Sequence, residues 1–343
     1  YAFGADVAFL PQAEQNGDFS GLASPLVNYA AGGVLVPGGK IPATSFHPIG
    51  VAVAKLYPAG NISPTIYTTT PVTHNDTDQT GIRADYARSA NDQYFLRYAW
   101  SQGDNLNPIS LRGSSLPGFP TQDNLTTHSA AVSNTHSFSP TLSNAARISF
   151  LRYLFDFDQR LNRTPPSAFG FQYSSASELG QGPPYFNLGG YSPVGGATSG
   201  PRNSAQNTYE IGDSLAWISG KHSAKFGGSF IRTQMNVFQS TVPNGLIIFS
   251  PSFPTSDSFA NLLLGSPVVF YQGIGDFGRG LRTWNSALYA QDEWRVKPRL
   301  TINYGLRWEV ITPNSEIRAR LNTFVAGVQS TVHPDAPTGI LFP

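Results

Sequence analysis

The sequence predicts an all-β fold of long antiparallel hairpins, and three observations support this fold class. Residues 300–310 alternate strictly between an apolar or aromatic side chain and a polar residue or glycine. Similar strands occur in pairs along the chain, with short turns within the pairs and long connections between them. Charged residues make up 13% of the chain and aromatic residues another 13%, whereas about 25% of an ordinary soluble protein is charged. Together these observations predict part of an antiparallel transmembrane β-barrel, with about ten strands in this chain.

The segment 300–310 carries the clearest pattern. Its even positions include Ile302, Tyr304, Leu306 and Trp308, and its odd positions hold only Thr, Asn, Gly, Arg and Glu. Because successive side chains of a strand point to opposite faces, this strand separates two different solvents. Its length also matches the roughly 9–11 residues that a tilted strand needs to cross a bilayer.

Four hairpins are predicted, and their other strands follow this pattern less strictly. Two further strands are predicted near 244–249 and 267–274. Asp213, Asp292 and Arg152 fall on the apolar side of their strands, and Phe95 falls on a polar side. A bulge, or a position outside the hydrocarbon band, would account for these exceptions. The four hairpins pair 79–88 with 93–103, 127–138 with 143–157, 207–218 with 223–236, and 282–296 with 300–311.

Two short helices are also predicted. Pro48 suits the first turn of a helix over 47–56, and its apolar residues would form a packed stripe. A second helix is predicted over 257–264, with Ser256 as its cap. Helices this short are expected within loops or filling gaps beside the sheet.

The chain divides into three predicted regions. Residues 1–78 are a loop-rich segment with a short helix, either a plug-to-barrel or a first-loop region. Residues 79–311 hold the barrel hairpins, and residues 312–343 are an extracellular loop. Because the sequence starts with Tyr1 and both of its ends read as loop, we expect it to be an internal piece, or a processed form, of a longer protein.

The predicted wall residues and ligand contacts follow from this division. Outer-membrane barrels have short periplasmic turns and long extracellular loops, so the loops 104–126, 158–206 and 312–343 are expected to contact a ligand. Aromatic and amide side chains there could bind a sugar or a peptide, although ordinary loop packing explains them equally well; they are Tyr173, Tyr185, Phe186, Tyr191 and Asn203. The predicted lipid-facing residues and aromatic belt are Tyr98, Trp100, Trp217, Trp294, Ile302, Tyr304, Leu306 and Trp308.

Composition argues against several classes of function. The net charge is +1, so nucleic acid is not an expected partner. The chain has no cysteine, which rules out disulfides and thiolate metal sites. No apolar run approaches the 18 residues of a membrane-spanning helix. We expect no metal, no cofactor and no enzymatic activity.

Three short motifs resemble functional sites but have simpler interpretations. Ser214 lies in the letters Gly-Asp-Ser-Leu of a hydrolase family, but it is predicted in mid-strand on the polar face, and His333 and Asp335 stand in the wrong order for a catalytic triad. The glycines of 273–278 fit a dinucleotide-binding loop, yet a strand is predicted to follow them. Residues 74–78 hold oxygen ligands for Ca²⁺ but lack the rest of that motif, so a solvated turn is favoured.

Several segments resemble the TonB-dependent outer-membrane receptors, most closely their Oar-like branch. The best match is the hairpin at 289–309, Tyr-Ala-Gln-Asp-Glu-Trp-Arg-Val-Lys-Pro-Arg-Leu-Thr-Ile-Asn-Tyr-Gly-Leu-Arg-Trp-Glu. The turn and strand at 220–228 (Gly-Lys-His-Ser-Ala-Lys-Phe-Gly-Gly) and the segment 259–265 (Phe-Ala-Asn-Leu-Leu-Leu-Gly) are also similar to that family. The likeness is spread over nearly the whole chain.

This resemblance implies a barrel of about 22 strands with a plugged lumen, of which this chain would supply roughly the first half. It implies nutrient uptake across the outer membrane of a Gram-negative bacterium, with energy passed by TonB. The partners would be outer-membrane lipid, an unidentified small molecule, sugar or peptide, and the TonB complex through parts that this chain lacks. The alternative is an outer-membrane or cell-surface β-protein that serves adhesion or assembly without transport. A hydrolase acting through Ser214 is a third and weaker hypothesis.

Overall fold

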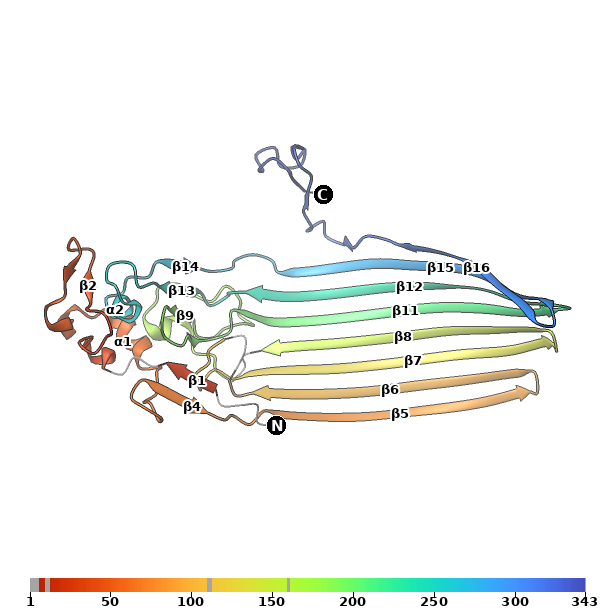
Figure 1. The fold of residues 1–343 in the computed structure, drawn as a ribbon, viewed down its shortest axis with the longest axis horizontal. Helices are drawn as coiled ribbons and strands as arrows, with labels where there is room; N and C mark the ends of the chain where they lie inside the picture. The colour runs from red at the N-terminus through yellow and green to blue at the C-terminus, as the bar shows by residue number, and fades with distance from the viewer. Residues whose placement is uncertain (1–5, 10–12, 110–112, 159–160, 343) are drawn as a thin grey trace.

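The structure is a computed structural model that describes residues 6–9, 13–109, 113–158 and 161–342. Its dominant feature is a long antiparallel sheet (Figure 1), which we call the wall. Within the described residues this sheet has nine strands in the order β16-β15-β12-β11-β8-β7-β6-β5, with the short β17 (Ser315–Glu316) beside β15. The chain therefore builds the wall by adding each hairpin next to the previous one.

The long strands of the wall extend much further than a bilayer requires. They contain between 12 and 21 residues, against the roughly 9–11 that a tilted strand needs to span the hydrocarbon. The strands are β5 (His74–Ser89), β6 (Asp92–Asn107), β7 (Thr121–Ser139), β8 (Leu142–Asp158), β11 (Ser199–Ser219), β12 (His222–Thr241), β15 (Gly278–Lys297) and β16 (Leu300–Ile311).

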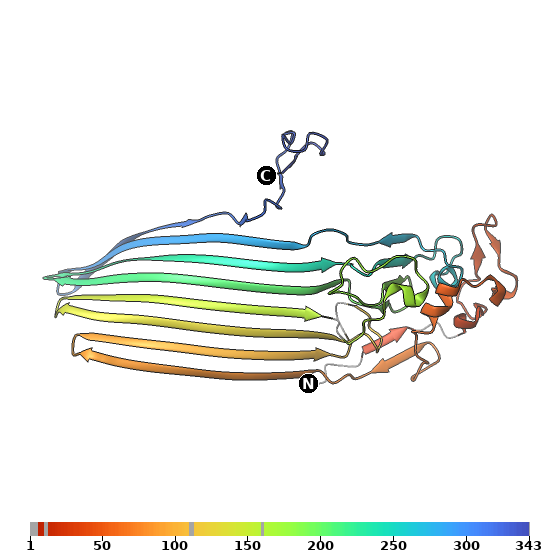
Figure 2. The ribbon, with the colours of Figure 1, turned by 180° about the vertical axis from the view of Figure 1, so that it is seen from behind.

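The four predicted hairpins are confirmed, and all four turns lie at the same end of the wall (Figures 1 and 2). Each turn leaves two residues outside the strands, as at Gly220-Lys221, where Gly220 has a φ of +60° that favours glycine. The long connections meet at the opposite end, which we call the loop end. The strands continue past the predicted boundaries toward the loop end, so part of each predicted loop belongs to the wall.

The predicted strands near 244–249 and 267–274 do not belong to the wall, which is a correction. They form β13 (Leu246–Phe249) and β14 (Val269–Tyr271), which are too short to cross a bilayer. They join β9 (Tyr185–Leu188) and β10 (Val194–Gly195) in a separate four-stranded sheet at the loop end. Among the described residues the wall has eight long strands and the short β17, close to the predicted total of about ten.

Both predicted helices form, and both lie at the loop end. α1 spans Pro48–Ala54 and α2 spans Ser258–Leu263. The cap of α2 is Asp257 rather than the predicted Ser256, because the Asp257 carboxylate accepts hydrogen bonds from the N–H groups of Phe259 and Ala260. Short 3₁₀ turns lie at Glu14–Asn16, Pro37–Gly39, Ala43–Ser45 and Pro166–Phe169.

Three small antiparallel pairs complete the described secondary structure. β1 (Asp6–Phe9) pairs with β4 (Ile66–Thr69), and β2 (Val27–Asn28) pairs with β3 (Val34–Leu35). β18 (Thr323–Phe324) pairs with β19 (Ile340–Leu341) in the C-terminal segment, which projects from the edge of the wall (Figure 1). The described structure holds no helix of the length and apolar character needed to cross a membrane.

The hydrophobic core lies at the loop end and not in the wall. Its buried residues come from 13–73, 113–120, 161–198 and 242–277, which together we call the loop-end assembly. Phe19, Phe186, Phe259 and Leu263 are among the fully buried members. This core packs segments that are far apart in sequence into one body at the loop end of the wall.

Candidate functional site

The strand pairing divides the wall into an apolar face and a polar face. Paired residues of neighbouring strands share a face, and successive residues alternate. Ile302 is paired with Trp294, Leu306 with Ala290, and Trp308 with Leu288. Followed from strand to strand, this register places all eight predicted belt residues on the apolar face, namely Tyr98, Trp100, Trp217, Trp294, Ile302, Tyr304, Leu306 and Trp308.

The apolar face is exposed, which is the reverse of a soluble sheet. Leu306 is 76% exposed and Ile148 is 60% exposed, although burying such side chains stabilises a protein in water by roughly 1.5–3 kcal/mol each. The opposite face carries Arg97 on β6, Ser149 on β8 and Glu210 on β11, which the register places in one row across the wall. A sheet with this pattern is stable where lipid contacts one face and water the other.

Polar residues border the apolar face near both ends. On β8, Asn144 and Arg152 bracket Ala146, Ile148 and Phe150 on the same face. Asn144 and Arg152 are eight positions apart on this strand, or about 27 Å along it. At the roughly 40° tilt of barrel strands this corresponds to a height of about 20 Å, slightly less than the ~25 Å apolar band of outer-membrane barrels.

The charged exceptions on the apolar face lie at or near these borders. Asp213 accepts a hydrogen bond of 2.8 Å from Asn144, and Asp292 accepts one of 2.7 Å from the Tyr304 hydroxyl, both toward the turn end. Arg152 lies at the opposite border. The strand register continues through all three positions, so the predicted alternative of a bulge is wrong there. On the polar face, Phe95 lies 4.8 Å from the Arg83 guanidinium.

Beyond the loop-end border the same face becomes polar. Gln102, Asp104, Asn124 and Asp156 occupy positions that continue the apolar face toward the loops. Gln122 donates hydrogen bonds of 2.9 and 2.8 Å to the two Asp104 carboxylate oxygens. These residues suit water, so the strands carry the loop-end assembly clear of the hydrocarbon layer.

The predicted ligand contacts Tyr173, Tyr185 and Tyr191 are half-buried in the loop-end assembly. The Tyr173 hydroxyl donates to the Asn244 carbonyl at 2.8 Å, and the Tyr191 hydroxyl donates to Asp257 at 3.1 Å. Burial raises the pKa of Tyr191, and the neighbouring Asp257 raises it further. These hydroxyls hold loops together, and the tyrosines keep only part of their surface for a ligand.

The other two predicted contacts need correction. Phe186 is 0% exposed and packs against Phe169 and Phe171, so its side chain is not open to a ligand in this structure. Its place in the core depends on contacts with distant segments, which the local sequence does not reveal. Asn203 is exposed, but it lies on β11 and not in a loop.

Asn203 lines a groove of about 450 Å³ at the loop end of the wall, which we call the rim groove. Asp156, Asn236 and Gly280 line it from the neighbouring strands, and the segment 316–318 closes its side. Ile317 packs against Gly280, where an added Cβ would lie 2.6 Å from the Ile317 side chain. The groove therefore combines amide and carboxylate side chains with several apolar ones, among them Leu154, Phe238 and Ile317.

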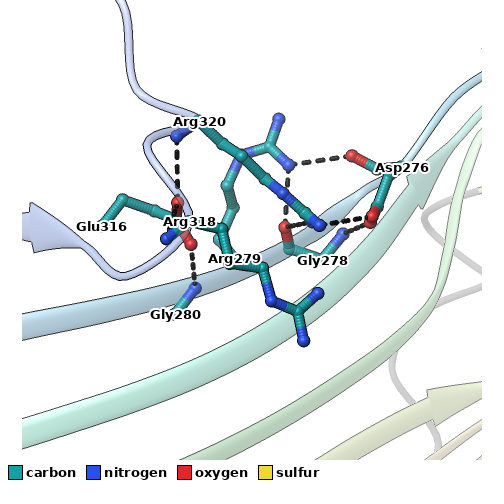
Figure 3. A network of polar contacts seen from close by, with 7 residues as sticks. All are labelled: Asp276, Gly278, Arg279, Gly280, Glu316, Arg318 and Arg320. Atoms are coloured by element: carbon teal, nitrogen blue, oxygen red, sulfur yellow. Dashed lines mark hydrogen bonds and ion pairs between the residues drawn. The ribbon is translucent and has the colours of Figure 1, made fainter. Parts of the chain in front are cut away.

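A polar network fixes the segment beside this groove (Figure 3). Glu316 accepts hydrogen bonds from the backbone N–H groups of Gly280 at 2.8 Å, Arg318 at 2.8 Å and Arg320 at 2.9 Å. The Arg320 guanidinium contacts Asp276 at 2.6 Å and donates to the Gly278 carbonyl at 2.7 Å. The C-terminal segment is thus attached to the start of β15.

Electrostatics keep both acids of this network ionised. The Gly278 N–H and the Arg320 guanidinium hold the pKa of Asp276 below its usual range. Burial opposes ionisation of Glu316, but the three backbone N–H groups and Arg320 outweigh it and lower its pKa. Arg318 is exposed and lines the rim groove, so it can offer a cation to a ligand. Sequence reasoning missed this network because its partners lie about 40 residues apart without a periodic pattern.

The short motifs fall in ordinary structural positions. Ser214 lies in mid-strand on β11 and is paired with Gly227 and Ala145. Residues 74–78 begin the exposed strand β5 and are not the expected turn. His128 contacts Tyr98 at 2.9 Å and His136 contacts Asp92 at 3.3 Å, so these two histidines have separate partners. In the described part of the chain, no three His, Asp or Glu side chains gather as a metal site.

Comparisons with solved structures find folds of outer-membrane receptors and transporters, each at a TM-score below 0.5. The ferripyoverdine receptor of Pseudomonas aeruginosa has 10% identity and a TM-score of 0.44, with 71% of this chain and 32% of that chain covered. The copper transporter OprC has 12% identity and a TM-score of 0.41, with 73% and 30% covered. The ferric-catecholate import receptor Fiu of E. coli K12 has 14% identity and a TM-score of 0.42, with 78% and 37% covered. The chain spans about a third of the length of these proteins.

The family comparison covers nearly the whole chain. Among curated proteins, no sequence matches it significantly. The family described as "Outer membrane beta barrel domain" matches residues 4–343. This match confirms the predicted barrel fold and the predicted location in the outer membrane. The chain therefore belongs to the outer membrane beta barrel domain family.

Proposed function

We propose that this chain is part of a TonB-dependent outer-membrane receptor that takes up a nutrient. The observation that carries the proposal is a wall with one lipid-type face and one water-type face, whose outermost long strands β5 and β16 each have a single partner strand among the described residues. β5 and β16 are exposed along their whole length. Because unpaired backbone groups cannot lie in lipid, further strands of a larger barrel would pair with both edges.

The three predicted regions take proposed roles in this receptor. Residues 79–311 supply wall, and residues 312–343 supply an external segment. Within the N-terminal region, residues 13–73 pack in the same core as the loops. This packing supports the first-loop alternative over the plug-to-barrel alternative. The plug and the TonB contact would come from other parts of the protein.

The proposed ligand surface combines the loop-end assembly with the rim groove. Tyr173, Tyr185 and Tyr191 would offer partly exposed rings, and Asn203 and Arg318 would offer polar groups. Such a surface suits a sugar, a peptide or another polar small molecule. The chain would act by binding and by forming the wall, without bond chemistry.

Growth of a deletion strain tests this proposal. The full-length gene is deleted, and growth is compared across scarce sources of iron, copper, sugar and peptide. The proposal predicts a defect on one source that the intact gene restores and a version lacking the TonB-contacting segment does not. Normal growth on every source, or rescue by the version without that segment, would contradict it.

The second candidate is a surface protein that serves adhesion or assembly without transport. It is favoured by the loop-end assembly, whose own hydrophobic core makes the external loops a rigid platform. This candidate predicts that the deletion strain grows normally on every nutrient but loses attachment to surfaces or to other cells.

A further inference from the structure

A row of cationic side chains lies on the apolar face at its loop-end border. Arg152 on β8, Asn207 on β11, Gln234 on β12 and Arg282 on β15 are successive partners in the strand register. Arg232 lies two residues from Gln234 on the same strand and the same face. We call Arg152, Arg232 and Arg282 the border arginines.

Each border arginine is held in place by a neighbour on the same face. The Arg152 guanidinium donates to the Asn207 side chain at 3.1 Å, and the Arg282 guanidinium donates to the Asn236 side chain at 3.0 Å. The Arg232 guanidinium lies 4.0 Å from the centre of the Trp284 ring. All three are half-buried, so their orientation is fixed rather than free in solvent.

No carboxylate of the described residues forms an ion pair with a border arginine. Along β8, the nearest carboxylate on the same face is Asp156, four residues from Arg152 and about 14 Å along the strand. Each guanidinium has five N–H donors. Among the described residues, Arg152 uses one in the hydrogen bond above, Arg282 uses two because it also donates to the Leu281 carbonyl at 2.8 Å, and Arg232 contacts only the Trp284 ring. The row therefore presents fixed positive charge and spare donors.

The position of this row determines which anion can reach it. It lies where the apolar band ends, beside Trp284 and in the same register row as Trp100, and tryptophan is typical of the headgroup level. A phosphate carried by a lipid whose chains lie along the apolar band would meet the guanidiniums there. Arginine also matches phosphate geometry with paired hydrogen bonds.

We propose that the border arginines bind the phosphate of a lipid headgroup in the leaflet at the loop end. The lipid chains would pack along Phe150, Tyr209 and Phe230 below the row, on the same face. The site would fix the depth of the wall in the membrane. The proposal applies equally to a transporter and to an adhesion protein.

Binding of a short-chain phosphatidic acid to the full-length protein in detergent tests this proposal. Diacylglycerol with the same chains is the ligand control. The triple substitution Arg152→Gln, Arg232→Gln and Arg282→Gln removes the border charge. The matched control is Arg97→Gln, Arg147→Gln and Arg307→Gln, which removes three arginines from the polar face.

We expect phosphatidic acid to bind more tightly than diacylglycerol, and the border substitution to weaken it at least about tenfold. The control substitution should leave the affinity within about twofold. A border Arg→Lys triple should bind with an intermediate affinity, because it keeps the charge but loses the paired hydrogen bonds of the guanidinium. Equal affinities for both lipids, or equal losses in the two triple variants, would overturn the proposal. Full displacement by inorganic phosphate alone would show a free-anion site and would also overturn it. Heat-modified gel mobility checks that each variant forms a barrel.

Discussion

The wall and the loop-end assembly use apolar side chains in opposite ways. In the loop-end assembly, Phe186 and Phe259 are 0% exposed and pack against other aromatic rings. In the wall, Ile148 and Leu306 point outward and are mostly exposed. The core also buries leucine and isoleucine, at Leu263 and Ile247, so the difference lies in the surroundings of these side chains and not in the residue type.

This contrast shows which interactions stabilise each region. The loop-end assembly is stabilised by removing apolar area from water, as in a soluble domain. The wall is stabilised by backbone hydrogen bonds between strands, since lipid offers those groups no alternative partner. Mutations should therefore have effects that depend on the region more than on the residue type.

Truncation of a buried ring should have the largest effect. Phe259→Ala leaves a cavity beside Tyr57 and Tyr191 and should cost about 3–5 kcal/mol. Phe230→Ala on the apolar face of the wall loses its contact with Trp284, at about 0.5–1.5 kcal/mol. Hydrogen exchange of the full-length protein measures both losses of stability, at the α2 amides for Phe259→Ala and at the β12 amides for Phe230→Ala. Equal losses at the two sites would contradict the contrast.

A charge placed on each face of one strand should have the next largest effect. Ile148→Arg puts a guanidinium on the apolar face and should cost about 2–4 kcal/mol in a bilayer. Ser149→Arg puts the same group on the polar face, opposite Glu210, and should cost less than about 1 kcal/mol. Urea unfolding in lipid vesicles gives both losses of stability. If Ser149→Arg cost more than Ile148→Arg, the assignment of the two faces would be wrong.

The pH dependence of the loop-end assembly should be smaller. Burial raises the pKa of Glu14, and the nearby Asp257 raises it further; burial also raises the pKa of Asp257. Because the folded state holds these protons more tightly, its stability is greatest below the unfolded values of 4.5 and 3.8. It falls as the pH rises through the raised values. Glu14→Gln should reduce this loss of stability with rising pH, measured by hydrogen exchange of the α2 amides. If the pH dependence of α2 stability were unchanged in the variant, Glu14 would not be its cause.

The smallest effect is expected at the C-terminal attachment. The pKa values of Asp276 and Glu316 are lowered, so their contribution is present at neutral pH and lost as the pH falls through the lowered values. Glu316→Gln should speed proteolysis after Arg318 or Arg320 at neutral pH while leaving the wall intact. Glu293→Gln on the wall is the matched control, and equal cleavage rates for the two variants would count against the network.

The sequence predicts the wall better than the loop end, and the reason is physical. Leu306 and Trp308 alternate with polar residues because each face meets a different solvent, so local sequence records the fold. Beyond the border, Asp104 meets water on a stretch of strand without an apolar period, so the sequence does not predict that β6 continues past residue 103 to Asn107. For the same reason the sequence predicts a loop at Asn203, which lies on β11.

The candidate site was predicted less well because it depends on distant contacts. Phe186 packs in a core assembled from four separate segments. Glu316 and Arg320 meet Gly280 and Gly278 across the edge of the sheet. The border arginines lie on separate strands, and only the register brings them into one row. None of these contacts leaves a periodic signal in the sequence.

Single-residue accessibility along β16 tests the central claim most directly. The chain contains no cysteine, so single cysteines at positions 302 to 308 can carry nitroxide labels in the full-length protein in lipid vesicles. The even positions should be accessible to oxygen dissolved in the lipid, and the odd positions to a nickel chelate in water, with a period of two. Equal nickel accessibility on both faces, or protection of the even positions from both reagents, would contradict a lipid-facing wall.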